Sequence, residues 1–524
     1  MRKYLIENIK INIDNLISSG EREVIINKLH LTEQKVKDFK ILRKSLDARK
    51  RNTEGVFYVY SVILSYPVKP GTKGCKVSIY KDRNVHPINL NKKKKLSPII
   101  VGSGPSGLFC ALYLAKMGYA PIVFERGEDI RNRVKTVKKF FDNGILNSNS
   151  NVQFGLGGAG TFSDGKINSR IKNPLKTEVL ETFVKCGAPR DIMYLNKPHL
   201  GTDKLRVIVE DLKALIEYYG GRFYFNSVVT DLIIKDNAVK GVIVNDDKEY
   251  ISDCVVLAVG NGARDTFNIL GKNNVNMTNK SFALGFRVEH LREEIDRCCY
   301  GKFAGHKVLG AADYNLTYHD DLYKKGVYSF CNCPGGVVVA GASGEGQVVT
   351  NGMSFRSRNM TNTNSAIVVN VNESDYGSDL FAGIRFQEAL EHRAFEMGGG
   401  NYNAPYMSIR DFLGIKGKTN VTPSYLPGVK ECDMNELLPE NLTSSIKSSF
   451  EYFNKFFDTF YNGVITGVES RTSSPVRILR NKLTLESENI KGLYPVGEGA
   501  GYAGGILSSA VDGIKAAIVI NDNN

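Results

Sequence analysis

A chain of 524 residues, 42% hydrophobic and 24% charged, is long enough for two or three domains with a large core. No run of 18 apolar residues occurs, so no transmembrane helix is expected, and the first residues lack the apolar core of a signal peptide. Nine cysteines without a framework spacing argue against a disulfide-rich secreted protein and favour reduced thiols in a cytoplasmic one.

The net charge of +14 is unevenly distributed along the chain. Residues 1–97 hold 22 Lys and Arg against 9 Asp and Glu, so nearly all of the excess lies in the N-terminal fifth. This asymmetry predicts a separate domain with a boundary near the four lysines at 92–95. Such a surface could bind nucleic acid or another polyanion. We favour the simpler interpretation, a lysine-rich face that is merely solvated.

Within this first domain the pattern of residue types predicts a small α+β fold. Residues 5–13 alternate as a strand does, with Ile9, Ile11 and Ile13 on one face. Residues 32–49 are expected to be helical, and the aromatic and β-branched residues 57–64 form a second strand. Residues 71–91 are expected to lead into a linker.

The next stretch carries the strongest signal in the chain. Residues 98–101 have strand character and run into Gly102-Ser103-Gly104-Pro105-Ser106-Gly107, after which residues 108–117 are typical of a helix. This G-x-G-x-x-G spacing between a strand and a helix favours a dinucleotide site, because bare glycines and free helix N–H groups can approach a pyrophosphate. A second strand, 120–125, ends at Glu125, a carboxylate suited to ribose hydroxyls. A glycine-rich turn beside a solvated glutamate is the less favoured alternative.

A second glycine-rich loop follows. Arg126, Arg131 and Arg133 are cations placed to meet phosphate, and residues 155–165 contain five glycines in eleven residues. Such a loop lets backbone pass close to a flat ligand. The apolar residues Phe154 and Phe162 favour an ordered segment over a flexible linker.

Further along, the elements of a parallel α/β sheet recur. Residues 205–219 are predicted to be helical, 221–234 to form two strands, and 254–260 to form a buried strand ending in glycine. Near the C-terminus a strand at 493–496 leads into a glycine-rich turn at 497–506 and a helix at 507–519. This second strand–glycine–helix junction would direct another helix N-terminus at the same ligand.

Several motifs resemble one family of flavoproteins. The motifs are FGLGGAGTFSDGK (154–166), CPGG (333–336), NGMS (351–354), ESRTSSPVR (469–477) and GEGAGYAGGI (497–506). They resemble the uncharacterised bacterial FAD-dependent (NAD(FAD)-utilizing) dehydrogenases, within the glutathione-reductase-type flavoprotein superfamily. The resemblance covers the chain from about residue 1 to its end.

The resemblance implies FAD as the resident cofactor, and NAD(P)H is expected to bind only transiently, if at all. It implies that N–H groups at the start of the last helix approach the flavin carbonyl edge and stabilise the reduced ring. The cofactor-binding residues that it implies are Gly102, Gly104, Pro105, Ser106, Gly107, Glu125, Arg126, Arg133, Gly158, Ser163, Asp164, Gly165, Lys166, Val229, Gly260, Gly497, Glu498, Gly504, Gly505 and Ile506.

Residues 281–480 are predicted to form a β-rich substrate domain. No second dinucleotide fingerprint occurs there, and strands are expected at 282–288, 327–331 and 337–340. The fold class is therefore α/β, a Rossmann-like FAD-binding domain with an inserted β-rich substrate domain and a small α+β N-terminal domain. The expected domains are 1–97 (N-terminal), 98–280 and 481–524 (FAD-binding) and 281–480 (substrate).

Candidate catalytic groups in this part of the chain are Arg287, His290, Cys333 and Arg471. His290 could donate a proton near neutral pH, although an isolated histidine beside a glutamate is usually a satisfied surface residue. Arg471 could bind a substrate carboxylate or phosphate, or equally form a structural pair with a glutamate. Strand alternation would place Cys331 and Cys333 on one face, and structural thiols are favoured over a redox pair. No metal-ligand spacing is present.

The expected function is that of an FAD-dependent oxidoreductase passing a hydride between flavin and an unidentified small organic substrate. Two alternatives stay open: an RNA-associated flavoprotein that uses the basic N-terminal domain, and a non-catalytic flavin redox sensor. No membrane partner is expected, and the sequence leaves the oligomeric state open.

Overall fold

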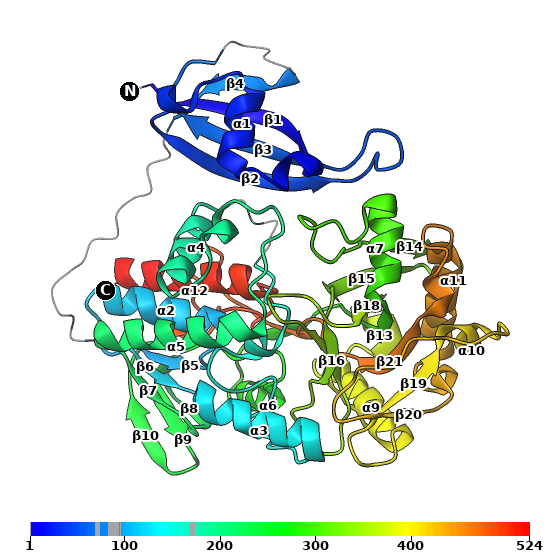
Figure 1. Ribbon diagram of the computed structural model, residues 1–524. Coiled ribbons are helices and arrows are strands. Elements are labelled where there is room, and N and C mark those ends of the chain that lie inside the picture. The colour runs from blue at the N-terminus through cyan, green and yellow to red at the C-terminus, as the bar shows by residue number, and fades with distance from the viewer. Residues whose placement is uncertain are drawn as a thin grey trace.

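The computed structural model describes residues 2–68, 74–81, 94, 96–167, 171 and 173–523. Figure 1 shows a small N-terminal sheet, in blue, above a body with two parts. One part is built on a parallel sheet covered by helices, and the other on a larger mixed sheet. The expected α/β class is confirmed. No helix among the described residues is long and apolar enough to cross a bilayer.

The N-terminal domain is a four-stranded antiparallel sheet with strand order β2-β3-β1-β4. Helix α1 (Glu21–Lys28) packs on one face, where Ile9, Ile25 and Tyr60 belong to one buried cluster. Burial of these apolar side chains stabilises the domain. Its strands are β1 (Tyr4–Asn12), β2 (Phe39–Asp47), β3 (Phe57–Leu64) and β4 (Lys76–Ile79).

The prediction of a helix over residues 32–49 is wrong. Residues Phe39–Asp47 are strand β2, which pairs along its length with β3, and the helix of this domain is α1 instead. Pairing with a strong neighbouring strand overrides the helical preference of a charged segment. Part of the expected linker is also structured, because β4 pairs with β1. Residues 71–73, 82–93 and 95, including most of the predicted boundary, lie outside the described residues.

The first part of the body is a five-stranded parallel sheet with strand order β23-β11-β5-β6-β7. This order places the glycine-loop strand β5 at the centre, so the loops after β5, β6 and β11 share one edge. The strands are β5 (Ile99–Val101), β6 (Ile122–Phe124), β7 (Arg222–Tyr224), β11 (Val255–Leu257) and β23 (Leu493–Pro495). A separate antiparallel sheet comprises β8 (Val229–Lys235), β9 (Ala238–Val244) and β10 (Lys248–Ile251).

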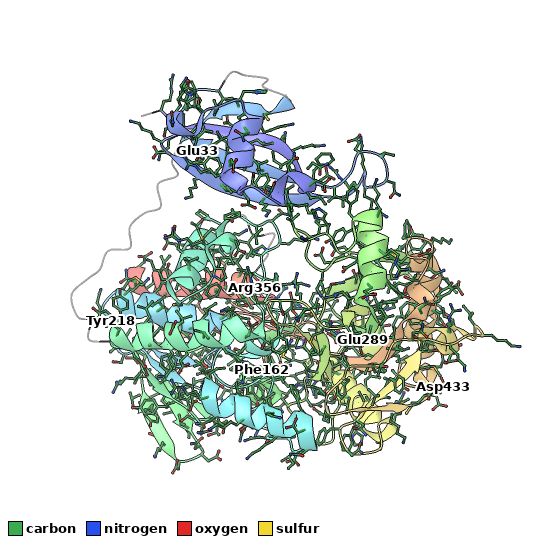
Figure 2. The ribbon with its side chains drawn as sticks, in the orientation of Figure 1. Glu33, Phe162, Tyr218, Glu289, Arg356 and Asp433 are labelled. Atoms are coloured by element: carbon green, nitrogen blue, oxygen red, sulfur yellow. The ribbon has the colours of Figure 1, made fainter. Side chains whose placement is uncertain are left out.

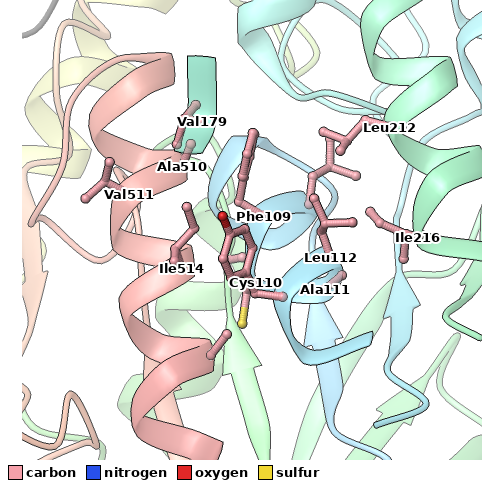
Figure 3. Close-up of a cluster of buried hydrophobic side chains, with 14 of the residues drawn as sticks. Phe109, Cys110, Ala111, Leu112, Val179, Leu212, Ile216, Ala510, Val511 and Ile514 are labelled. Carbon is pink, nitrogen blue, oxygen red and sulfur yellow. The ribbon is translucent and has the colours of Figure 1, made fainter. Parts of the chain in front are cut away.

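Helices pack against the parallel sheet and form the largest core of the molecule. Figure 3 shows Phe109 and Leu112 beside Ile514 and Leu212, four side chains at most 1% exposed. Phe109 and Ile514 lie about 400 positions apart in the sequence, so the last helix packs into the same core as the helix that follows the glycine loop. The helices of this part are α2 (Pro105–Lys116), α3 (Ile130–Asn143), α4 (Leu175–Lys185), α5 (Thr202–Tyr218), α6 (Arg264–Lys272) and α12 (Ile506–Asp522).

The second part is a seven-stranded sheet inserted between β12 (Met277–Asn279) and β22 (Val476–Ile478), which pair with each other. Its strand order is β14-β15-β18-β13-β21-β19-β20, and only β19 and β20 are parallel. The strands are β13 (Phe282–Leu291), β14 (Thr317–Asp320), β15 (Lys325–Cys333), β18 (Asn362–Val371), β19 (Ala404–Ser408), β20 (Val429–Glu431) and β21 (Val464–Glu469).

Helices and a hairpin complete this part. A buried apolar cluster joins the sheet to α9 (Ala382–Met397) and α11 (Glu440–Asn454). The hairpin of β16 (Val337–Ala340) and β17 (Thr350–Met353) lies against strand β18. The strands predicted at 282–288, 327–331 and 337–340 are confirmed.

The N-terminal domain contacts both parts of the body. The backbone of Lys44 in β2 accepts a hydrogen bond from Asn196 N at 2.9 Å and donates one to Tyr194 O at 2.7 Å. On the other side, the Tyr58 hydroxyl donates to Val308 O at 3.1 Å. The domain therefore bridges two loops of the body rather than hanging from a linker.

Candidate cofactor and substrate site

A cavity of about 1230 Å³ lies where the parallel sheet meets the inserted sheet. At one end it is lined by Gly104, Glu125 and Gly260, which follow the carboxyl ends of β5, β6 and β11. At the other end it is lined by Cys331 and Asn351, from β15 and β17. Ligands of open α/β sheets bind at this edge.

The first glycine loop is shaped by two close approaches of backbone. Gly102 has φ of 100°, and a Cβ there would lie 2.7 Å from Ala258 O. A Cβ on Gly107 would lie 2.0 Å from Gly102 O, so α2 can pack against the loop only without a side chain. With Gly104 as its N-cap, α2 begins at the cavity and directs its free N–H groups there.

Four cavity-lining glycines present bare backbone to open space. A Cβ added to Gly104, Gly260, Gly504 or Gly505 would meet no atom within 4 Å. Gly505 is the N-cap of α12, so a second helix N-terminus faces the same space. Bare backbone and two positive helix ends form a cradle for a flat, anionic ligand, which fits a dinucleotide such as FAD.

Glu125 holds the two glycine loops together. Its carboxylate is 5% exposed and accepts hydrogen bonds from Ser103 N (2.9 Å), Ser103 Oγ (2.6 Å), Gly127 N (3.0 Å) and Gly155 N (3.0 Å). Charge-assisted bonds to backbone N–H groups are strong ones. Glu125 thus shapes the loops as well as lining the cavity, and its spacing from Gly102 did not predict this second role.

The second glycine loop is held by a buried arginine. The Arg133 guanidinium donates to the carbonyls of Asn151 (2.9 Å), Leu156 (2.7 Å), Val152 (3.0 Å) and Gly158 (3.0 Å). Burial lowers the pKa of Arg133 to about 9. The guanidinium makes these hydrogen bonds to the loop, and the side chain does not line the cavity.

Phe162 packs beside this arginine. It lies inside the body (Figure 2), is 1% exposed, and its ring centroid is 4.8 Å from the Arg133 guanidinium. An aromatic ring against a guanidinium is a favourable contact. The loop is therefore anchored by side chains at this point.

Family models match three parts of the chain. Residues 6–65 match a domain of unknown function (DUF8436), residues 100–170 an NAD(P)-binding Rossmann-like domain, and residues 281–472 the model described as FAD-dependent protein, C-terminal domain-like. A protein of Clostridium beijerinckii, itself named only as uncharacterized, is 43% identical over 521 residues, covering 98% of this chain and 97% of that protein. The chain belongs to the same family as this Clostridium protein, and its residues 281–472 match the FAD-dependent C-terminal model.

Three solved structures are similar in outline. CtdE in complex with FAD is 14% identical, with 82% of this chain and 84% of that chain covered and a TM-score of 0.32. A glycine oxidase from Bacillus cereus is 12% identical, with 82% of this chain and 98% of that chain covered and a TM-score of 0.32. A geranylgeranyl bacteriochlorophyll reductase-like protein from Thermoplasma acidophilum is 13% identical, with 83% of this chain and 80% of that chain covered and a TM-score of 0.34.

The residues predicted to bind cofactor all line the cavity except Gly107, Arg133 and Gly497. Gly107 serves the packing of α2, and Arg133 holds a loop. Gly497 donates its N–H to Asp512 at 2.9 Å, and a Cβ there would lie 2.5 Å from Ser106 Oγ. These three shape the site from behind its surface.

The structure brings only one of the four candidate catalytic residues, Arg471, to the cavity. Its guanidinium is bound to the buried Glu391 at 2.9 and 3.1 Å, which is the structural pair considered from the sequence. His290 is fully buried, its Nε2 lies 2.8 Å from Phe460 O, and burial lowers its pKa to about 4. It does not reach the cavity and is not suited to donate a proton there.

Arg287 and Cys333 lie just behind the cavity wall. Arg287 is 0% exposed and pairs with Glu469 at 2.5 and 3.1 Å, and it also donates a hydrogen bond to Cys331 O at 2.9 Å. Both of these partners of Arg287, Glu469 and Cys331, line the cavity, whereas Arg287 itself does not. Cys333 is 0% exposed. The strand places its neighbour Cys331, rather than Cys333, at the surface of the site.

Several residues of the site escaped the sequence analysis. Asn261 donates to Glu498 Oε1 at 3.0 Å, and burial raises the pKa of Glu498 to about 7. Lys197 pairs with Asp313 at 2.9 Å, and both line the cavity. Asn261 directly follows the predicted Gly260 and could have been found. Asp313 carries no local signal, because the fold alone brings it to Lys197.

Charges near the second glycine loop are also paired. Burial opposes ionisation of Asp164, but the charges of Arg358 and Lys166 outweigh it and lower the pKa of Asp164. Arg358 contacts Asp164 at 2.5 Å, and the Lys166 ammonium donates to Asn332 O. No cluster of metal-ligating side chains occurs among the residues the structure describes.

Proposed function

We propose that FAD occupies this cavity and that the protein transfers a hydride between the flavin and a small organic substrate. The observation that carries the proposal is the continuity of the cavity. One space joins the dinucleotide loop at Gly104, the bare N-terminus of α12 at Gly505 and the side-chain wall at Cys331. The adenosine half would be held beside Glu125, and the ring system beside Gly504 and Gly505.

When bound, the isoalloxazine of FAD supplies the two-electron redox chemistry. The chain's own contribution is electrostatic. The N-terminus of the 17-residue helix α12 carries partial positive charge, and Lys166 adds a full charge on the same cavity wall. Both favour the accumulation of negative charge beside them without reorganisation.

Glu498 is the group best suited to hold a proton at this site. Its carboxyl lines the cavity, receives a hydrogen bond from Asn261, and has a pKa that burial raises to about 7. A carboxyl that titrates near neutral pH can both take and release a proton during turnover. This gives Glu498 a role beyond contact with the cofactor.

The substrate end of the cavity is polar and mixed in charge. Lys197, Asp313, Asn315 and Thr317 line it together with Tyr328. Because the two charged groups neutralise each other at 2.9 Å, this end favours a polar substrate held by hydrogen bonds. NAD(P)H is proposed only as a transient electron donor.

Anaerobic reduction tests the proposal. Protein saturated with FAD and then dialysed should keep flavin and be bleached by NADH, by NADPH or by a member of a panel of small polar substrates. Retained flavin that no reductant bleaches would contradict the enzymatic proposal while leaving the cofactor site. Failure to retain any flavin would contradict both.

A further inference from the structure

Two cysteines meet at the end of β15, beside the cavity. Cys331 lines the cavity and is partly exposed, whereas Cys333 is 0% exposed behind it. The Cys333 thiol lies 3.4 Å from Cys331 O, and the two thiols shift each other's pKa, that of Cys331 downward and that of Cys333 upward. Of the nine cysteines, all of them described, only Cys331 lines the cavity.

An irregularity in the strand brings the two residues together. In a regular strand the Cα atoms of residues i and i+2 are about 6.6 Å apart, near the upper limit for a disulfide. Here the pairing of β15 with β18 shifts register between Phe330 and Cys333, and Cys331 has φ of 46°. Such a bulge bends the strand, and the Cys333 sulfur lies 3.4 Å from Cys331 O. A left-handed conformation is uncommon at a non-glycine residue.

The backbone opposite makes room for the buried sulfur. A Cβ at Gly352 of β17 would lie 2.7 Å from Cys333 Sγ. Cys333 can therefore sit behind Cys331 only because position 352 has no side chain.

The charges around the pair favour a thiolate at the exposed position. Arg287 donates to Cys331 O at 2.9 Å, and Lys166 donates to Asn332 O. The hydrogen bond from Cys333, together with the charges of Lys166 and Arg287, lowers the pKa of Cys331 to about 5, against the effect of burial. The acidic groups nearby, Glu469 and Asp164, are each paired with an arginine. An exposed thiolate beside a buried thiol is the arrangement of an attacking and a resolving cysteine.

We propose that Cys331 and Cys333 are a redox-active pair that cycles between dithiol and disulfide by exchanging two electrons with the flavin in the same cavity. The proposal rests on the proposed function, since the flavin is the electron partner. In the oxidising direction the Cys331 thiolate and the Cys333 S–H together give up one proton and two electrons as the S–S bond forms. The two electrons would pass to oxidised flavin, and the Cys333 proton to the flavin or to solvent. The reverse reaction consumes reduced flavin and restores both thiols.

An anaerobic titration with dithionite measures the electrons that the pair holds. The oxidised, FAD-loaded protein should take up four electrons per chain before reduction is complete. Cys331→Ser and Cys333→Ser should each take up two. Cys432→Ser, which changes another partly exposed cysteine that does not line the cavity, should still take up four. Using both variants of the pair guards against a folding defect at the buried position.

Alkylation followed by mass spectrometry gives a readout independent of the flavin. Oxidised protein should show a Cys331–Cys333 disulfide that is absent after reduction. Uptake of two electrons by the FAD-loaded wild type, with both cysteines alkylated in the oxidised sample, would overturn the inference. If the protein retained no flavin the proposed function would fail, and treatment with oxidised dithiothreitol would still decide whether the disulfide forms.

Discussion

At the glycine-loop end the cavity wall is bare backbone, whereas at the inserted-sheet end it is made of side chains held in charge pairs. Gly104, Gly260 and Gly504 leave open space in front of the chain. At the far end, Glu469 forms an ion pair with Arg287, and Lys197 forms one with Asp313. The first end therefore depends on the absence of side chains, and the second on the balance of buried charges. The two ends should fail in different ways when they are mutated.

The largest effect is expected from filling the backbone end. In Gly504→Leu a branched side chain would project into the space that a bound ring needs, and the protein should retain essentially no flavin. Flavin absorbance per chain after dialysis measures this. Gly310→Leu is the matched control, because a Cβ at Gly310 also meets nothing within 4 Å but the residue does not line the cavity. A Gly504→Leu protein with full flavin content would show that α12 does not begin at the cofactor.

At the side-chain end, the main expected effect is on stability. Arg287→Met leaves Glu469 charged and buried without its partner, which should cost about 3–5 kcal/mol of unfolding free energy. Urea unfolding monitored by circular dichroism measures the loss. The double variant Arg287→Met/Glu469→Leu removes both charges and should recover most of the stability. If the free energy of unfolding of Arg287→Met were within about 1 kcal/mol of the wild-type value, the ion pair would not contribute to stability as argued.

This difference between the ends explains what the sequence could predict. The backbone end is encoded locally, since Ile99 to Glu125 is one strand–loop–helix–strand unit, and most of the predicted cofactor residues do line the cavity. Where those predictions missed, as with Arg133, the residue supports a loop from behind. Periodicity and turn residues carry such local information.

The side-chain end could not be predicted in the same way, because its contacts join distant segments. The pairing of Arg287 with Glu469 spans 182 positions, and nothing near His290 indicated that it would be buried. The bulge at Cys331 depends on the register with β18, which no local pattern specifies. The same reason accounts for the missed strand β2, whose partner β3 determines its conformation.

The backbone end should also depend on one side chain, that of Glu125. Glu125→Gln keeps the size of the group but loses its charge and replaces an acceptor with a donor that faces backbone N–H groups. The loss of charge-assisted hydrogen bonds should weaken FAD binding by about 1.5–3 kcal/mol, or roughly 10- to 150-fold in Kd. Fluorescence titration with FAD measures it. Glu128→Gln, whose carboxylate accepts from Ser150 and does not line the cavity, should bind normally. Equal affinity of the two variants would contradict the role of Glu125.

The smallest effect should be a pH dependence from Glu498, which lies between the two ends. Burial raises its pKa in the folded protein from 4.5 to about 7. Below about pH 4.5 the carboxyl is protonated in both states and has no effect on stability. Between that pH and about 7 the unfolded chain releases the proton that the folded protein keeps, so stability falls as the pH rises. Above about 7 both states are ionised and the penalty stays constant.

The full shift corresponds to about 3 kcal/mol, and since the side chain is open to the cavity we expect on the order of 1–2 kcal/mol. Urea unfolding of the wild type and of Glu498→Gln, each at pH 5 and pH 8, isolates the contribution of Glu498 to the pH dependence of stability, because the other titrating groups are common to both proteins. The wild type should lose more stability than the variant on going from pH 5 to pH 8. An equal loss in both would mean that the cavity leaves Glu498 fully hydrated, and Glu498 would then not be suited to hold a proton beside the flavin at neutral pH.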